Sequence, residues 1–121
     1  KEGMSIRMRE NPNVYLLGED VGAFGGCFGV SAGMFKEFGG KRICDTPISE
    51  GAIIGTAIGS AATGLRPIAE IMMGDFVTVA MDQLVNQSAK MRYMFGGKIS
   101  LPMVVRLPGG AGVSGDADDR G

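Results

Sequence analysis

The chain contains no histidine among its 121 residues. This absence removes the side chain that proteins use most often for acid–base chemistry near neutral pH and for binding metals. Its only two cysteines, Cys27 and Cys44, have neither metal-binding nor redox spacing, which favours a reducing intracellular compartment. The formal net charge is −1, so no strong field attracts nucleic acid or an anionic membrane. The longest uncharged apolar run, 51–65, is shorter than the roughly 20 residues of a membrane span.

Glycine, in contrast, is abundant. It accounts for 21 of the 121 residues, well above the usual share of about 7%. The glycines have no collagen period and lie among apolar segments, so low-complexity disorder is excluded. A hydrophobic share of 45% and a charged share of 21% indicate an ordinary globular domain.

Apolar runs and helical segments alternate along the chain. We expect strands at 14–17, 42–44, 68–72 and 101–107, and helices at 4–9, 31–38, 50–63 and 76–94. Ser31, Ser49 and Asp75 are the expected N-caps of the last three helices. The alternation predicts an α/β fold with a parallel sheet flanked by helices. Ligands bind such sheets beyond the carboxyl ends of the strands, which places the loops at 19, 48–50 and 74–76 at the expected site. We also expect the chain to be a fragment, because a strand and an open loop end it.

Three glycines share one face of the predicted helix 50–63. Gly51, Gly55 and Gly59 are each four residues apart, and residues at this spacing lie on the same side of a helix. Glycine inside a helix costs about 1 kcal/mol relative to alanine, so a close contact must compensate. Two interpretations stay open: tight packing on the sheet within the domain, or a helix–helix contact across a subunit interface.

The remaining candidate residues have ordinary explanations when each is considered alone. The glycine-rich loop 22–29 lacks the Gly-Lys-Ser/Thr end of a P-loop and the G-x-G-x-x-G spacing, so it is expected to be a flexible surface loop. Glu19 and Asp20 follow a strand, where acids are usually solvated. Glu50 opens a helix, where a carboxylate complements the helix dipole. Phe76 at a helix start is most often a core residue.

Five segments, however, resemble one family in order. They are LLGEDVG (16–22), DTPISE (45–50), GLRP (64–67), AKMRYM (89–94) and PMVVR (102–106). They resemble the β-subunit of the thiamine-diphosphate-dependent 2-oxo acid dehydrogenases of pyruvate, branched-chain and acetoin type, which is related to transketolase. The resemblance runs from about residue 4 to residue 115. It implies a partial transketolase-like pyrimidine-binding domain over 1–121, without the family's second β-subunit domain.

The resemblance also implies roles for four residues. Glu50 matches the glutamate that hydrogen-bonds the aminopyrimidine ring of thiamine diphosphate and activates the cofactor. Glu19 matches an acid near the interface that is proposed to join a proton path between two active sites. Ile48 and Phe76 match residues that pack around the pyrimidine and exclude water.

The family's cofactor and partners are expected with this assignment. Thiamine diphosphate would lie between this domain and an α-subunit, which would hold Mg²⁺ and the diphosphate in an α2β2 heterotetramer. The parent oxidoreductase would decarboxylate a 2-oxo acid or cleave acetoin and pass the acyl group to a lipoyl acyltransferase core. The stretch YMFGG (93–97) leans towards the acetoin or bacterial pyruvate type. The implied location is the bacterial cytoplasm or the mitochondrial matrix, with no nucleic-acid or membrane partner.

The tail departs from the family pattern. The family continues towards a Gln-His-Ser-Gln segment whose histidine faces the cofactor, whereas this chain reads SGDADDRG at 114–121 and has Asp119 at the histidine position. An aspartate would repel a substrate carboxylate or a developing oxyanion at neutral pH. The alternative interpretation is therefore a catalytically inactive homologue or fragment that serves as an interaction module. A nucleotide-binding Rossmann domain is a third, weaker interpretation.

Overall fold

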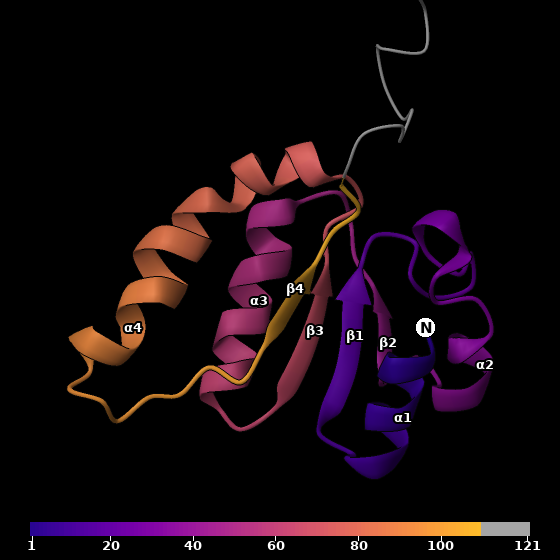
Figure 1. Cartoon of the computed structure of the whole chain (residues 1–121), viewed down its shortest axis with the longest axis horizontal. Coiled ribbons are helices and arrows are strands. Elements are labelled where there is room, and N and C mark those ends of the chain that lie inside the picture. The colour runs from indigo at the N-terminus through magenta and orange to yellow at the C-terminus, as the bar shows by residue number, and fades with distance from the viewer. Residues whose placement is uncertain (110–121) are drawn as a thin grey trace, which may run out of the picture.

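Four parallel strands form a single sheet at the centre of the molecule (Figure 1). The computed structural model describes residues 1–109. The strand order is β2–β1–β3–β4, with β1 at Val14–Gly18, β2 at Ile43–Asp45, β3 at Arg66–Glu70 and β4 at Val104–Arg106. This arrangement confirms the predicted α/β fold with a parallel sheet flanked by helices.

Helices cover both faces of the sheet (Figure 1). Helix α3 (Glu50–Ala62) packs on one face, together with a helical stretch that ends in α4 (Ala89–Met94). Helix α1 (Glu2–Glu10) and the short α2 (Met34–Phe38) pack on the other. Because successive residues of a strand point to opposite faces, Leu17 joins the α3 core whereas Leu16 joins the α1 core.

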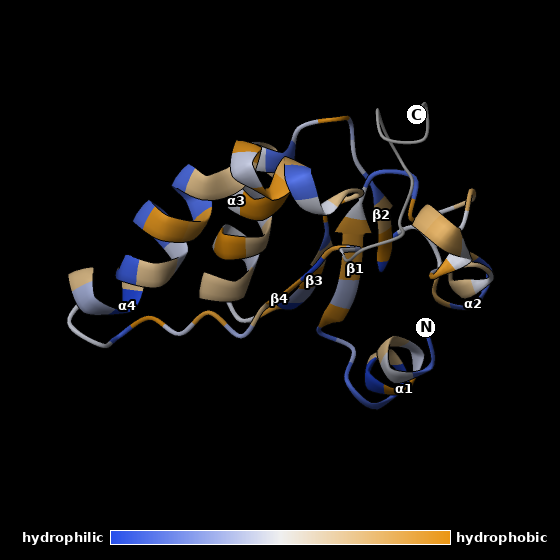
Figure 2. Ribbon diagram, turned by 45° about the horizontal axis from the view of Figure 1, so that its top comes forward, coloured by the Kyte–Doolittle hydropathy of each residue, from blue (hydrophilic) through white to orange (hydrophobic). Residues whose placement is uncertain are grey.

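The two cores are built from different sequence patterns. The core under α3 contains Ile53, Ile54, Ala57 and Ile58, spaced so that they share one face of the helix. Figure 2 shows hydrophobic residues of β1 and β2 between the two helical layers. Each fully buried leucine or isoleucine contributes about 1.5–3 kcal/mol relative to an exposed one. Together these residues hold the sheet between its helices and fix the position of its carboxyl edge.

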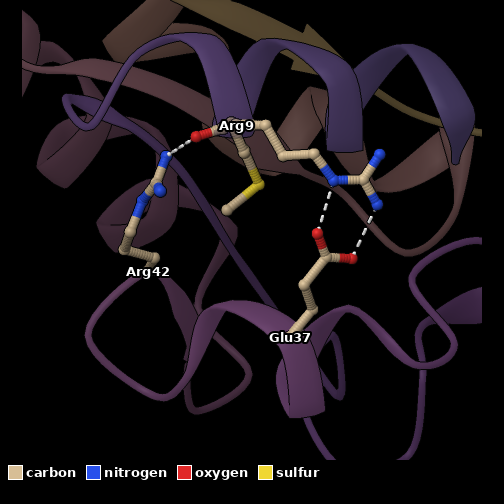
Figure 3. Close-up of polar contacts among 4 residues, drawn as sticks. Arg9, Glu37 and Arg42 are labelled. Atoms are coloured by element: carbon tan, nitrogen blue, oxygen red, sulfur yellow. Dashed lines mark hydrogen bonds and ion pairs between the residues drawn. The ribbon is translucent and has the colours of Figure 1, made fainter.

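A polar clamp joins α1 to α2 and β2 (Figure 3). Arg9 donates from Nε and Nη2 to the two carboxylate oxygens of Glu37, at 2.5 and 2.9 Å. Arg42 donates from Nη2 to the Met8 carbonyl at 2.6 Å and also bonds the carbonyls of Asn11 and Val14. The bonds from Arg42 to Met8 and Asn11 satisfy carbonyl groups at the end of α1, which no intrahelical N–H can reach.

The predicted helix at 76–94 is only partly correct. The stretch begins at Gly74 and consists of a 3₁₀ helix η2 (Gly74–Ala80), a π-helical turn η3 (Asp82–Ser88) and α4. Asp75 lies inside η2 and provides no cap, which corrects the expected N-cap. Apolar periodicity identifies a helix, but it does not distinguish hydrogen bonds three, four or five residues apart.

The two predicted serine caps have different outcomes. Ser49 is the N-cap residue of α3, as expected, but its side chain makes no capping hydrogen bond. Ser31 is fully buried and donates its hydroxyl hydrogen to the Val21 carbonyl at 2.7 Å, so α2 begins later, at Met34. The Ser31 hydroxyl thus bonds a carbonyl group from a distant part of the chain and not the backbone N–H groups of a following helix.

The strands are confirmed with different ends. β4 covers only Val104–Arg106 of the expected 101–107, because its residues pair in register with Ile68–Glu70 of β3. β3 begins and ends earlier than the expected 68–72. Within 1–109, no helix has the length and apolar character needed to cross a membrane.

Candidate functional site

The strand order creates a switch point at the carboxyl edge of the sheet, between β1 and β3. The chain leaves β1 towards β2 on one side and leaves β3 towards β4 on the other. Loops diverge at such a point and open a crevice, which is where open α/β sheets bind ligands. Glu19 directly follows β1, and Glu70 is the last residue of β3. Two carboxyl groups therefore lie at the position where this topology binds a ligand.

Gly18 allows the carboxyl ends of β1 and β3 to approach closely. A Cβ atom at this position would lie 2.8 Å from the Glu70 carbonyl oxygen and 2.9 Å from the Glu70 Cβ. Any side chain would therefore force the two strands apart. Glycine at this position of the LLGED segment therefore permits the close approach of β1 to β3 directly before Glu19.

The loop after β1 is rigidly bonded. The Gly22 N–H donates to Asp45 Oδ1 at 2.6 Å, and the Gly26 N–H donates to the Asp20 carbonyl at 2.8 Å. Asp20 itself has φ of 52°, in the left-handed region that few non-glycine residues adopt. Strain of this kind persists only where surrounding contacts enforce it. The position of Glu19 is thus set by its neighbours on both sides.

The glycine-rich loop 22–29 differs from its prediction. Gly22, Gly25 and Gly26 are buried, although Phe24 and Phe28 are exposed. A Cβ at Gly26 would meet the Ser31 hydroxyl at 2.6 Å and would lie 3.4 Å from Glu70 Oε1. The expectation of a flexible surface loop is therefore wrong for its buried glycines, because they pack against the carboxyl edge of the sheet.

Glu19 is a buried carboxyl group without a full set of partners. It is 7% exposed, and its Oε1 atom has no hydrogen-bond partner within residues 1–109. Burial raises the pKa of Glu19, and the neighbouring charges of Glu50 and Asp20 raise it further. The carboxyl group therefore holds its proton more strongly than an ordinary glutamate does.

Glu50 lies at the start of α3 and is also 7% exposed. Its charge contributes to the raised pKa of Glu19, which is consistent with both residues lying at the carboxyl edge of the sheet. A buried carboxyl at a helix N-terminus is stabilised by the helix dipole when it is ionised. Two buried acids with different surroundings can hold and exchange a proton, which is the requirement for acid–base chemistry.

The structure places the other two predicted residues at the surface. Ile48 precedes α3 and is 83% exposed, and Phe76 in η2 is 36% exposed. Neither belongs to the two core clusters. The usual explanation of Phe76 as a core residue is therefore wrong. An exposed isoleucine beside a buried acid is available to contact a ligand or a partner.

One ion pair at the same edge was missed by sequence reasoning. Glu70 is 1% exposed, and its Oε2 atom forms a close ion pair with Nη1 of Arg106 at the end of β4. The register pairs the two residues directly. Arg106 entered the sequence analysis only as part of the PMVVR segment. The sequence did contain a signal for this ion pair, because two strands end in residues of opposite charge. Using it would have required knowing that the two strands are neighbours in the sheet.

The glycine face of α3 meets a helix rather than the sheet. A Cβ at Gly55 would lie 3.3 Å from Gln83 Oε1 in η3, whereas a Cβ at Gly59 would meet nothing within 4 Å. The packing interpretation is thus correct for Gly55 in having a partner inside the domain, but wrong in placing that partner on the sheet. Gly59 faces outwards, and its interface interpretation stays a prediction.

A second hollow, at the opposite edge of the sheet, lacks these properties. It measures about 620 Å³ and includes Arg7, Glu10 and Arg66 among its lining residues. All three ionisable groups are exposed, and Arg7 and Glu10 bond each other at 2.8 Å. Because none of these ionisable groups is buried, this hollow is the weaker candidate.

The described residues provide carboxyl groups for binding a ligand, but no cluster of side chains that would bind a metal ion. Within 1–109, no three His, Cys, Asp or Glu side chains are grouped to hold a metal ion. The buried pair Glu19 and Glu50 fits a ligand that presents a ring nitrogen or an N–H group, because a carboxyl group can donate to the first and accept from the second. Asp116, Asp118 and Asp119 of the unusual tail lie outside the described residues.

Comparison with known proteins identifies a family and several relatives. The family described as "transketolase, pyrimidine binding domain" matches residues 1–119. The acetoin:2,6-dichlorophenolindophenol oxidoreductase subunit beta of Bacillus subtilis (strain 168) is 49% identical over 92% of this chain and 36% of its own length. The 2-oxoisovalerate dehydrogenase subunit beta of the same organism is 46% identical over 93% of this chain and 34% of its own.

A human relative is similar to the same extent. The mitochondrial pyruvate dehydrogenase E1 component subunit beta of Homo sapiens is 46% identical over 91% of this chain and 31% of its own length. The chain thus spans about a third of the length of these curated relatives.

Proposed function

Because the chain belongs to the transketolase pyrimidine-binding domain family, we propose that it binds the pyrimidine ring of thiamine diphosphate. It would do so as part of the β-subunit of a 2-oxo acid or acetoin dehydrogenase. The observation that carries this proposal is the pair of buried acids, Glu19 and Glu50, at the switch point of the sheet. The names of the similar proteins support the reaction class.

Glu50 is the proposed catalytic residue. Its carboxyl group would hydrogen-bond a ring nitrogen of the aminopyrimidine and exchange a proton there. Thiamine diphosphate, when bound, supplies the electron sink for cleaving the bond next to a carbonyl group. Burial at the start of α3 holds the Glu50 carboxyl in place and keeps bulk water away from it. The fixed position of α3 on the sheet makes this orientation independent of the ligand.

Glu19, Ile48 and Phe76 complete the proposed site. Glu19, whose pKa the charge of Glu50 raises, would join a proton path between two active sites. Ile48 and Phe76 would form apolar walls against the pyrimidine, which is consistent with their exposure in the isolated domain. Burial of these side chains by ligand and partner would remove apolar surface from water and strengthen binding.

The partner in this proposal is an α-subunit. It would hold Mg²⁺ and the diphosphate in an α2β2 assembly, and a lipoyl acyltransferase core would receive the acyl group by reductive acylation. Exposed Tyr93, Met94 and Phe95 at the end of α4 supply an apolar surface that suits subunit contact. Residues 1–121 would form the pyrimidine-binding part of the subunit, working in the bacterial cytoplasm or in the mitochondrial matrix.

A second candidate function rests on the missing histidine. No histidine occurs anywhere in the sequence, and the tail has aspartates where the family has its Gln-His-Ser segment. A chain of this kind could keep the fold and bind an α-subunit without supporting decarboxylation. In that case the protein would act as an interaction module.

Thiamine diphosphate binding to the chain co-expressed with an α-subunit distinguishes the candidates. We expect calorimetric binding with Mg²⁺ present, weakened at least about tenfold by Glu50→Ala, because a buried charge-assisted hydrogen bond is lost. Glu37→Ala, which removes an exposed glutamate on α2, is the matched control and should bind normally. Assembly without cofactor binding would leave only the interaction module.

A further inference from the structure

Two buried oxygen atoms at the carboxyl edge lack hydrogen-bond partners within the described residues. They are Oε1 of Glu19 and Oγ1 of Thr46. Buried polar atoms in proteins are almost always hydrogen-bonded, and each exception indicates a ligand, a water or strain. Glu19 is more than nine-tenths buried, so solvent does not satisfy its Oε1 atom.

Strand register brings these two residues together. Gly18 of β1 pairs with Asp45 of β2, and the Thr46 N–H continues the ladder by donating to the Gly18 carbonyl at 2.9 Å. Glu19 and Thr46 are the next residues along the two strands. Both lie one residue beyond the paired stretch, and the register extended by that one residue assigns them to neighbouring positions, at the strand spacing of about 5 Å.

The two side chains also point to the same face of the sheet. Alternation along β1 puts Leu17 in the core under α3, and along β2 it puts Cys44 against the same core. Glu19 and Thr46 are two residues further on, one beyond the end of each strand, and the same alternation assigns them to that face. Asp45 points to the other face, where it accepts from the Gly22 N–H at 2.6 Å, so it is engaged elsewhere.

One water molecule placed between the two side chains satisfies this geometry. Neither Glu19 nor Thr46 bonds the other directly, and a water bridges two polar groups that lie beyond direct hydrogen-bond reach. Thr46 also lines a cleft of about 160 Å³ beside the first turns of α3, which gives water a route to the Thr46 side chain. We propose that one bound water joins the Thr46 hydroxyl to the Glu19 carboxyl, and that Thr46 is thereby a positioning residue for Glu19.

The bridge has a defined direction. The Thr46 hydroxyl donates to the water oxygen, and the water donates one hydrogen to Glu19 Oε1. A donor to the carboxylate favours the ionised form of Glu19. Around Glu19, Glu50 on α3 and Asp20 in its own loop favour the neutral form. On the other face Asp45 bonds Gly22, and Glu70 is paired with Arg106. Thr46 is thus the neighbour that opposes retention of the proton.

Infrared titration of the Glu19 carboxyl group tests the bridge. The protonated carboxyl stretch is isolated by subtracting the spectrum of Glu19→Gln, using the full chain in complex with an α-subunit. Thr46→Val keeps the shape and removes the hydroxyl, so we expect the Glu19 pKa to rise by about one pH unit. Thr46→Ser should restore it. Thr56→Val, which changes an exposed threonine of the same cleft, is the matched control and should leave it unchanged.

Each outcome is decisive for the bridge. An unchanged Glu19 pKa in Thr46→Val, or an equal rise in Thr46→Ser, would overturn the proposal, because the hydroxyl would then have no effect. Circular dichroism of each variant excludes unfolding as the cause. Only the consequence for proton transfer rests on the proposed function. Because the titration needs no cofactor, failure of thiamine diphosphate binding with an intact pKa shift would reject the function and leave the bridge standing.

Discussion

Glu37 on α2 and Glu19 after β1 are carboxylates of one small domain, yet their surroundings move their pKa values in opposite directions. The hydrogen bond from Arg9 lowers the pKa of Glu37, with further lowering by the charges of Arg9 and Lys1. Burial raises the pKa of Glu19, and Glu50 and Asp20 raise it further. Glu37 is exposed and paired, whereas Glu19 is buried and lacks a partner for Oε1 within 1–109.

This difference separates structural acids from reactive ones. At the clamp between α1 and α2, opposite charges meet in solvent and add little to stability. At the carboxyl edge, like charges are brought together out of water. This destabilises the fold, and such arrangements are found mainly where function requires them.

Glu50→Gln is expected to have the largest effect. The amide keeps the shape of the side chain but cannot exchange a proton, so turnover should fall about 10²- to 10⁴-fold while assembly stays near normal. The measurement is single-turnover decarboxylation with an artificial electron acceptor. The protein measured is this domain extended by the family's Gln-His-Ser segment and second β-subunit domain. Glu37→Gln is the control at the clamp and should keep full turnover. Near-normal turnover in Glu50→Gln would contradict the role of Glu50.

Arg106→Met should destabilise the fold by about 2–3 kcal/mol. The change leaves the carboxylate of Glu70 buried without its ion pair, and partial exposure of Arg106 places the cost below that of a fully buried pair. Urea unfolding of the chain measures the loss. The double variant Arg106→Met/Glu70→Gln should recover part of it, because no uncompensated charge is left. Equal stabilities of the single and double variants would show that the pair is not the cause.

Gly55→Leu and Gly59→Leu separate the two roles of the glycine face. Gly55 already lies against Gln83, so leucine there should cost about 1–3 kcal/mol through overpacking. Gly59 has open space, so leucine there should leave the melting temperature nearly unchanged. If Gly59 is part of a subunit interface, sedimentation will show weaker association of this variant. Normal assembly of Gly59→Leu would exclude that interface.

Glu19→Gln should stabilise the fold at neutral pH by about 0.5–1 kcal/mol. The folded-state pKa is raised, so above it the ionised carboxylate destabilises the fold. This penalty fades as the pH falls through the folded pKa and is absent below the unfolded value near 4.5. Thermal melts at pH 7 and pH 4 should therefore show a gain that is lost in acid. A loss of stability at pH 7 would mean that the folded state favours the ionised form of Glu19, against the raised pKa.

Glu37→Gln should show the opposite and smallest pH dependence. The pKa of Glu37 is lowered in the folded state, so its stabilising effect is present above the unfolded value near 4.5 and is lost as the pH falls through the folded pKa. The variant should melt slightly earlier at pH 7 and like the wild type in strong acid. High salt should remove the difference, because both partners are exposed. A salt-independent difference would contradict an ionic origin.

The fold class and much of the site location could be predicted from the sequence. Short apolar runs alternating with helical segments indicated a parallel sheet, and Glu19 and Glu50 were located at its carboxyl edge from their places after a strand and at a helix start. The local sequence pattern was sufficient to predict these elements, because the periodicity of a strand or a helix can be recognised from consecutive residues. The DTPISE segment then carried the assignment to a family.

Partnerships between distant residues could not be predicted in this way. The caps expected at Ser31 and Asp75 were wrong, and Ser49 occupies the expected N-cap position without a capping hydrogen bond, because a capping prediction considers only the adjacent backbone. The 3₁₀ and π turns of 74–88 were missed for a similar reason, since apolar spacing does not report which carbonyl each N–H reaches.

The sequence by itself thus determined which residues are acidic, which face of each element is apolar and which segments follow the family pattern. Only the tertiary structure decided that Glu70 is paired with Arg106 while Glu19 and Thr46 have buried atoms without partners in 1–109. Pairing depends on strand order and register, and these place residues next to one another that the chain separates by tens of positions. Burial then raises the pKa of Glu19, because the free energy of a charge depends on what surrounds it in space.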